Sequence, residues 1–366
     1  SDSHEGSWIG IEFKSGSNQG RISYCDFSHS QTTISGGNAV SQLTHSTFSH
    51  ISAPGIISLN SATGEDNQFN LPPGNPSLVL TINGGSVRRN SFVGGANGIA
   101  ASGTVVVEDN NLTNLSGSGI RISTAGNQMR IENNNLSNCG VGISLSVDGG
   151  SGQVRYNNID GCSTGLVLEG GNQASSLAGW QVAYNNLTSS SQYAVRCENN
   201  RQTISEIDLG LNWWGSLDAT SIAGGIYDFT QDSQKSRVNY SPLLAQAYDG
   251  TEASLPQGPA NPQIIINDGQ ALTSSRNLSL TTSASATAGS AVTEMRITQD
   301  VQELIGSEEG YRAYQTSQSV QLPEQIGTYY LYAQFRDSAL EASAIAFSTI
   351  DYLPPNILKD TIDQDR

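Results

Sequence analysis

Four charged residues recur at one phase of a repeat of about 22 residues. Arg88, Glu108, Glu132 and Arg155 each stand four residues before the apolar residue of a recurring Asn-x-apolar motif. If successive repeats stack about 5 Å apart, Glu108 and Glu132 have the separation that retaining glycosidases need between two carboxylates. Both, with Arg155 and the nearby Arg130, are therefore candidates for catalysis. Each Glu also has an Arg as its neighbour on the far side, so charge pairing along a surface column is the simpler interpretation.

Aromatic and polar residues occur close to this column. Asp109 is expected to form one column with Asn133 and Tyr156 another with Tyr184, and Trp180 lies a few residues before Tyr184. Rings that stack on sugars and planar polar groups that bind hydroxyls can together form a shallow sugar-binding face. These four residues are candidate ligand-binding residues, and stabilisation of the repeat alone is the alternative.

Two histidines, His29 and His50, share another phase, two residues after the apolar position. Stacked imidazoles could bind a divalent metal or act as acid and base. The alternative is a solvated turn column, because later members of the same phase are Asn114, Asn138 and Gly161. No cofactor is predicted, and Ca²⁺ is left open as a ligand.

Two cysteines, Cys139 and Cys162, also share a phase and should stack in adjacent repeats. Their expected separation suits a disulfide, but parallel Cβ vectors make the bond geometry awkward, which favours two buried thiols. Whether they are bonded stays open. Cys25 and Cys197 are too many repeats apart to pair, and no metal-type Cys spacing is present.

The repeat itself predicts how these residues are positioned. The apolar anchors fall at residues 27, 48, 69, 92, 112, 136, 159 and 187, and a small-aliphatic pair follows most of them seven or eight residues later. Units this short cannot bury an apolar face alone, but three short strands per coil can stack into a right-handed parallel β-helix about 4.8 Å per coil. One turn column would then be an asparagine ladder made of Asn90, Asn110, Asn134, Asn157 and Asn185.

Residues 8–245 resemble the right-handed parallel β-helix repeat proteins, the pectate-lyase-like superfold in the broad sense. The opening Trp8-Ile9-Gly10-Ile11-Glu12-Phe13 is similar to the entry of such repeats in bacterial surface proteins, and Asn212-Trp213-Trp214-Gly215 is similar to their closing coil. Two adjacent tryptophans can cover the open apolar end of the coils. A sugar-stacking role for Trp213 or Trp214 is the alternative.

After Leu244 the repeat ends and a second domain is expected. Residues 250–262 carry three prolines and read as a linker. Longer alternating strands then predict a small antiparallel β-sandwich over 263–352, and residues 353–366 an exposed tail. Ile266-Asn267-Asp268-Gly269 and the run Tyr330 to Asp337 resemble bacterial immunoglobulin-like modules. The predicted fold is all-β: a right-handed parallel β-helix of about ten coils over 1–249, followed by an immunoglobulin-like β-sandwich.

Composition limits the partners. Seventeen Lys+Arg against 33 Asp+Glu give the 366-residue chain a formal net charge of −16. Nucleic acids and anionic membranes need clustered basic charge, so neither is an expected partner. No apolar stretch approaches the roughly 18–20 residues of a membrane span, and Ser1 to Gly6 do not form a signal peptide. Because the sequence starts inside a repeat, we expect an excised or processed chain. We also expect a monomer.

Two functional hypotheses remain. The first is a secreted or cell-surface bacterial β-helix module, an adhesin-like part without catalysis, that presents a rigid face to glycans or another surface partner. The second is a polysaccharide lyase or glycoside hydrolase acting on an extracellular polysaccharide. The absence of motifs expected in pectate lyases and polygalacturonases favours the non-catalytic module. The chain has no Arg-x-Pro-x-x-Arg, no Gly-His-Gly and almost no lysine inside the repeat.

Overall fold

The structure, a computed structural model, describes residues 8–14, 20–30, 34–35, 40–51, 56–72, 79–147, 149–170, 177–199, 206–287, 289–305 and 307–355. Contacts between residues divide the chain into two compact units. The first comprises residues 1–215 and 221–239, and the second comprises residues 216–220 and 240–366.

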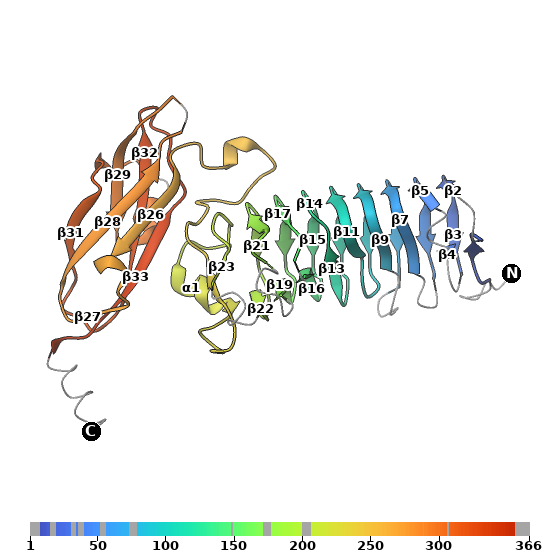
Figure 1. Cartoon of the computed structure of the whole chain (residues 1–366), viewed down its shortest axis with the longest axis horizontal. Helices are drawn as coiled ribbons and strands as arrows, with labels where there is room; N and C mark the ends of the chain where they lie inside the picture. The colour runs from blue at the N-terminus through green and yellow to red at the C-terminus, as the bar shows by residue number, and fades with distance from the viewer. Residues whose placement is uncertain are drawn as a thin grey trace, which may run out of the picture. The chain divides into compact units, whose positions relative to one another are not determined.

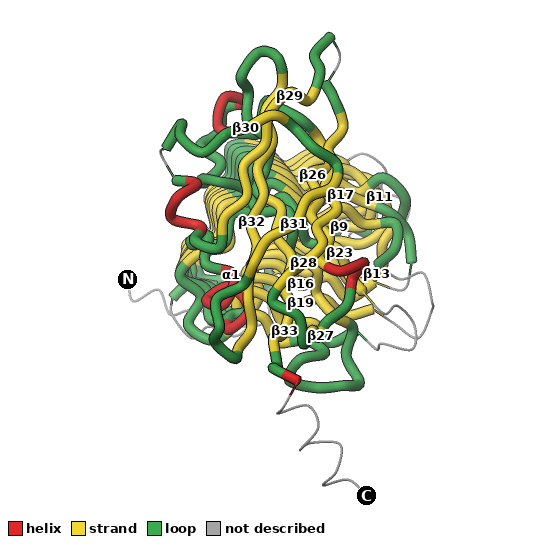
Figure 2. Tube along the Cα trace, turned by 90° about the vertical axis from the view of Figure 1, so that its left-hand side faces the viewer, coloured by secondary structure: helices red, strands yellow, loops and turns green. Residues whose placement is uncertain are grey.

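The first unit contains a stack of coils, each of which contributes one short strand to an eight-stranded parallel sheet. Figure 1 shows the coils following one another, and Figure 2 looks along the stack, so that equivalent strands of successive coils lie one behind another. The eight strands are β3 (Asp26–Ser28), β6 (Thr47–Ser49), β8 (Gln68–Asn70), β10 (Ser91–Val93), β12 (Asn111–Thr113), β15 (Asn135–Ser137), β18 (Asn158–Asp160) and β21 (Asn186–Thr188). In this sheet Leu112 pairs with Leu136 and Leu136 with Ile159, as the repeat predicts.

A larger parallel sheet forms the rest of the coil wall. Its main path is β2 (Gly20–Ser23), β5 (Val40–Thr44), β7 (Ile56–Glu65), β9 (Val79–Arg88), β11 (Ile99–Glu108), β13 (Ser118–Ala125), β16 (Val141–Val147), β19 (Thr164–Gly170), β22 (Tyr193–Cys197) and β24 (Ile226–Tyr227). The strands β14 (Met129–Glu132), β17 (Gly152–Arg155) and β20 (Trp180–Ala183) join it beside that path.

The three short strands expected in every coil are separate in only some of the described coils, as in the one with β4 (Ile34–Ser35), β5 and β6 and in those from β13 onward. In coils between them the second and third strands merge into one ten-residue strand, β7, β9 or β11, and the register of β11 against β13 shifts between Ala101 and Ser102. From β13 on, chain inserted at the bend separates β13 from β14 and β16 from β17.

The coil count is lower than the expected ten, because the described eight-stranded sheet has one strand per coil. Outside it, β1 (Ile11–Glu12) pairs with β4 (Ile34–Ser35), and β23 (Glu206–Asp208) pairs with β25 (Arg237–Asn239). Near the C-terminal end of the stack, helix α1 (Ala219–Gly224) interrupts the repeat. Trp213 still bridges to Asn186, and Trp214 is buried, as the capping interpretation requires.

The predicted asparagine ladder is present inside the coils and is longer than expected. Each amide spans two coils: Asn110 Nδ2 donates to Asn134 Oδ1 (2.9 Å), and the Asn110 backbone N–H donates to the same oxygen (3.0 Å). The same pattern links the buried residues Asn67, Asn90, Asn110, Asn134, Asn157, Asn185 and Asn212. Because buried backbone groups need partners, the ladder fixes the register of each coil on the next.

Apolar side chains fill the interior beside the ladder. Phe27, Phe48, Phe69 and Phe92 stack with ring centroids 4.9, 4.8 and 4.4 Å apart, and aliphatic anchors continue the same column. The residue after each buried ladder asparagine points outward instead. Asn135 Nδ2 donates to Asn111 Oδ1 (2.8 Å) at the exposed surface. The Asn-x-Ser/Thr sequences that begin at Asn111, Asn135 and Asn186 lie on the strands β12, β15 and β21.

The second unit contains a β-sandwich of two sheets. One sheet holds β26 (Ala260–Ile266), β28 (Asn277–Ser285) and β31 (Ser317–Gln321). The other holds β27 (Leu272–Thr273), β33 (Ala346–Tyr352), β32 (Gly327–Asp337), β29 (Val292–Thr298) and β30 (Arg312–Ala313). Both sheets contribute to one core, in which Leu280 and Phe335 are fully buried. This agrees with the predicted sandwich, and the immunoglobulin-like assignment stays a prediction.

The boundary between the units differs from the expected one. Contacts place it between Asn239 and Tyr240, whereas the sequence suggested residue 249. The expected linker 250–262 contains the 3₁₀ helix η2 (Glu252–Ser254) and the start of β26, because Ala260 already pairs with Ser285. Two further 3₁₀ helices, η3 (Asn267–Gly269) and η4 (Val301–Leu304), lie within the sandwich. Most of the expected tail, residues 356–366, lies outside the described residues.

Replacement of one ladder amide tests the role of the ladder. Asn134→Ala removes the acceptor of the Asn110 N–H and a donor to the Val107 carbonyl (3.0 Å each), which leaves buried polar groups without partners. We expect the free energy of unfolding to fall by about 3 kcal/mol in guanidinium chloride titrations followed by circular dichroism.

The matched control is Asn135→Ala at the next residue, whose side chain is exposed. We expect it to cost about 0.5 kcal/mol. Equal losses in the two variants would show that the buried amides do not hold the coils together.

Candidate functional site

The predicted charged column exists, and its glutamates are paired with arginines. Glu108 lies opposite Glu132 in the register of β11 and β14. Arg155 Nε lies 2.7 Å from Glu132 Oε1, Arg130 Nη1 lies 3.7 Å from Glu132 Oε2, and Arg88 Nε lies 3.4 Å from Glu108 Oε2. The Glu132 side chain is only 6% exposed. A buried carboxylate between two guanidiniums is poorly placed to exchange protons with a substrate, so this geometry favours charge pairing over catalysis.

Three of the four predicted ligand-binding residues lie in one column. Asp109, Tyr156 and Tyr184 all have left-handed backbone angles (φ 58°, 61° and 61°), which places them at equivalent turns of their coils. The rings of Tyr156 and Tyr184 stack 5.7 Å apart, and the Arg155 guanidinium lies 5.2 Å from the Tyr156 ring centroid. Burial raises the pKa of Tyr184.

Trp180 does not join this column. It occupies the phase of Gly152 and of the fully buried Met129, which is the inward-facing phase of β14, β17 and β20. Its ring covers Gly152: a Cβ added there would meet ring carbons at 2.7 and 2.9 Å. Trp180 therefore packs over Gly152, and its expected part in a sugar-binding face with the two tyrosines stays a prediction.

The histidines and cysteines stack as predicted. The imidazoles of His29 and His50 lie 5.0 Å apart with an interplanar angle of 2°. Within the part of the chain that the structure describes, no group of three or more His, Cys, Asp or Glu could hold a metal ion. Cys139 and Cys162 are buried free thiols, and the hydrogen bond with Cys162 together with burial raises the pKa of Cys139.

A small groove follows the outer face of β14, β17 and β20. It has a volume of about 300 Å³, and three of its lining residues, Arg130, Gln153 and Gln181, share one outward phase. Gln153 Nε2 donates to Gln181 Oε1 (3.4 Å). Of the residues predicted as catalytic, only Arg130 lines this groove.

A larger groove, which we call the lateral groove, lies on the outer face of β13, β16, β19 and β22. It has a volume of about 610 Å³ and is lined by Ser118, Arg121, Val141, Ser144, Val167, Glu169, Arg196 and Glu198. Arg121, Ser144, Val167 and Arg196 pair in register from coil to coil. The Cα atoms of Arg121 and Arg196 are therefore about 14 Å apart, three coil spacings, with Ser144 and Val167 between them.

The charges of the lateral groove are nearly balanced. Arg196 Nε and Lys235 Nζ each lie 2.5 Å from an oxygen of Glu198. Burial acts to raise the pKa of Glu198, but the hydrogen bond from Lys235 and the charge of Arg196 outweigh it, so this pKa is lowered. Arg121 and Glu169 have no ion pair with any other residue that the structure describes.

Aromatic rings lie at one end of the lateral groove. The Arg196 guanidinium lies 5.7 Å from the centroid of the Tyr227 ring, and Tyr227 pairs with Arg196 in register. Tyr193, one coil earlier, has its ring centroid 5.5 Å from that of Tyr227. The groove thus combines hydrogen-bonding groups of both charges with an aromatic surface.

These features define a parallel β-helix whose outer columns form grooves. The family of right-handed β-helix regions matches residues 34–212, the part of the chain that contains most of the stacked coils. No curated protein matches the chain. No helix among the described residues is long and apolar enough to cross a membrane.

Removal of an arginine tests whether its ion pair with Glu132 offsets the cost of burying the Glu132 carboxylate. We expect Arg155→Ala to lower the free energy of unfolding by about 2 kcal/mol, because Glu132 then remains buried without its closest counter-charge. In that background Glu132→Gln should recover about 1 kcal/mol by removing the buried charge. Chemical denaturation of the single and double variants measures both effects.

The control is Arg130→Ala, which removes the longer of the two ion pairs from a side chain that is 42% exposed. It should cost less than about 1 kcal/mol. If Arg130→Ala lowered the free energy of unfolding as much as Arg155→Ala, this description of the charged column would be wrong.

Proposed function

We propose that this chain is a module of a secreted or cell-surface bacterial protein that binds a neutral glycan in the lateral groove without cleaving it. The observation that carries the proposal is the groove itself, in which Arg121 and Arg196 flank a floor formed by Ser144 and Val167. The match of residues 34–212 to right-handed β-helix regions is compatible with a surface or extracellular protein.

The chemistry of the lateral groove suits sugar hydroxyl groups. Guanidinium groups donate several hydrogen bonds in a plane, carboxylates accept them, and the serine hydroxyl can do both. The rings of Tyr193 and Tyr227 beside Arg196 offer a surface on which a pyranose can stack. A linear glycan lying across several coils would meet the same backbone spacing at each step.

Electrostatics favour a neutral glycan over an acidic one. The chain carries a formal net charge of −16, which repels polyanions over the distance of the Debye length. Within the groove, Arg121 and Arg196 are matched by Glu169 and Glu198. This balance gives no excess positive charge to hold a polyuronate.

One observation favours the enzymatic alternative, a polysaccharide lyase or glycoside hydrolase. Glu169 and Glu198 line the same groove from neighbouring coils, and a pair of carboxylates is the usual requirement for glycoside hydrolysis. Glu198 is held ionised by Lys235 and Arg196, so Glu169 would have to act as the acid.

A glycan array rich in neutral polysaccharides, followed by calorimetric titration of the best ligand, tests the proposal. Arg121→Ala should weaken binding about tenfold, because it removes charge-assisted hydrogen bonds to the sugar. The control Arg21→Ala removes an exposed arginine of β2, outside the groove, and should leave the affinity unchanged.

Three results would contradict the proposal. The first is the absence of binding to any neutral glycan, and the second is an equal loss of glycan affinity in Arg21→Ala and Arg121→Ala. The third is the release of reducing ends or of unsaturated products that absorb at about 235 nm. Loss of such a product signal in Glu169→Gln would establish the enzymatic alternative instead.

A further inference from the structure

The outer face of the five-stranded sheet in the second unit carries a row of aromatic rings. Along β32, Thr328, Tyr330 and Tyr332 point away from the core, whereas Leu331 and Ala333 belong to it. The rings of Tyr330 and Tyr332 stack with centroids 6.4 Å apart and an interplanar angle of 20°. Exposure decreases along the row: Thr328 is exposed, Tyr330 is half-buried and Tyr332 is buried, so the row is open to solvent at Thr328 and Tyr330.

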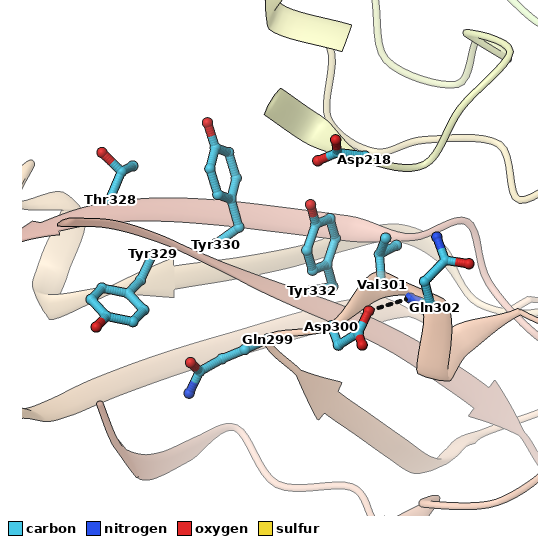
Figure 3. A pocket seen from close by; sticks show the side chains of 9 residues that line it. All are labelled: Asp218, Gln299, Asp300, Val301, Gln302, Thr328, Tyr329, Tyr330 and Tyr332. Atoms are coloured by element: carbon cyan, nitrogen blue, oxygen red, sulfur yellow. Dashed lines mark hydrogen bonds between the residues drawn. The ribbon is translucent and has the colours of Figure 1, made fainter. Parts of the chain in front are cut away.

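A pocket of about 400 Å³ lies over this row, within the size range of small-molecule sites. Figure 3 shows Tyr332 pointing toward Asp218, which comes from residues 216–220 of the same unit, with Asp300 beside η4. The Ala219 N–H donates to the Tyr332 hydroxyl (3.2 Å), which holds this segment over the sheet. The Asp300 carboxylate accepts from the Gln302 N–H (2.9 Å), which fixes its position at the start of η4.

The charge of this pocket has one sign. Its lining contains the carboxylates of Asp218 and Asp300, three tyrosines, a threonine, a valine and two glutamines, and no Lys, Arg or His. Burial, and to a lesser degree the charges of Asp218 and Asp300, raise the pKa of Tyr332. The negative charges of both carboxylates are therefore felt at the Tyr332 hydroxyl. A negative field beside the π faces of tyrosine rings is the environment that stabilises an organic cation.

We propose that this pocket binds an alkylammonium group, with its positive charge between Asp218 and Asp300 and its methyl or methylene groups on Tyr330 and Tyr332. A hydrated metal ion would gain nothing from the rings, whereas an alkylammonium uses both the charge and the apolar surface. The site is independent of the lateral groove, since every residue that lines it belongs to the second unit.

Choline is the probe, and 3,3-dimethyl-1-butanol is its neutral control of the same shape. Titration of the full chain, followed by tyrosine resonances in NMR, should show choline binding at least about tenfold more tightly than the alcohol. A lysine ester should compete with choline, because it presents a primary alkylammonium. Vesicles of phosphatidylcholine distinguish a lipid headgroup from free choline as the source of the group.

Two variants locate the site. Asp300→Asn keeps a residue that can cap η4 and should weaken choline binding about fivefold, and Tyr330→Leu should weaken it by a similar factor. Asp268→Asn, an exposed carboxylate of η3 outside the pocket, should leave binding unchanged. Equal affinity for the alcohol, displacement of choline by millimolar Ca²⁺ but not by the lysine ester, or unchanged binding in Asp300→Asn would overturn the proposal.

Discussion

The buried amide ladder is the constraint on which the β-helix depends. Each ladder asparagine satisfies a backbone N–H of the coil before it and carbonyls of two coils, as Asn134 does for Asn110, Val107 and Glu132. A coil shifted by one residue would bury these groups without partners and turn its apolar side chains outward. The ladder therefore sets one register for the whole stack, and side chains of equal phase form columns.

Those columns determine the chemistry of the surface. Where residues of opposite charge occupy the same phase, as Glu132 and Arg155 do, they form an ion pair along the column. The Glu132 carboxylate is then buried beneath its partners. Where two arginines stand apart with small residues between them, as with Arg121 and Arg196, the column opens into a groove. The same physical rule thus produces a stabilising stack in one place and a candidate binding site in another.

Much of the fold could be predicted from the sequence, because the ladder asparagines and apolar anchors keep constant residue types at constant phase. The pairing of Leu112 with Leu136 and the stacking of His29 on His50 follow from that phase alone. The inward phase of Trp180 could not be predicted in this way, because a large ring at that position needs the space left by Gly152 one coil earlier.

The candidate sites were harder to predict. The lateral groove is formed at one phase by four residues of three types, Arg121, Ser144, Val167 and Arg196, so no constant residue type marks it in the sequence. The pocket of the second unit combines Asp218 with Asp300 and Tyr332, which lie far apart in the chain and meet only through tertiary contacts. Such sites follow from side-chain volume and loop placement and not from periodicity.

Hydrogen–deuterium exchange of the chain with a bound neutral oligosaccharide tests most directly whether coil register builds the binding site. The account predicts slower exchange in peptides that cover β13, β16, β19 and β22, with no change in the eight-stranded sheet formed by strands such as β12 and β15. Protection of the eight-stranded sheet, or of no coil at all, would contradict it.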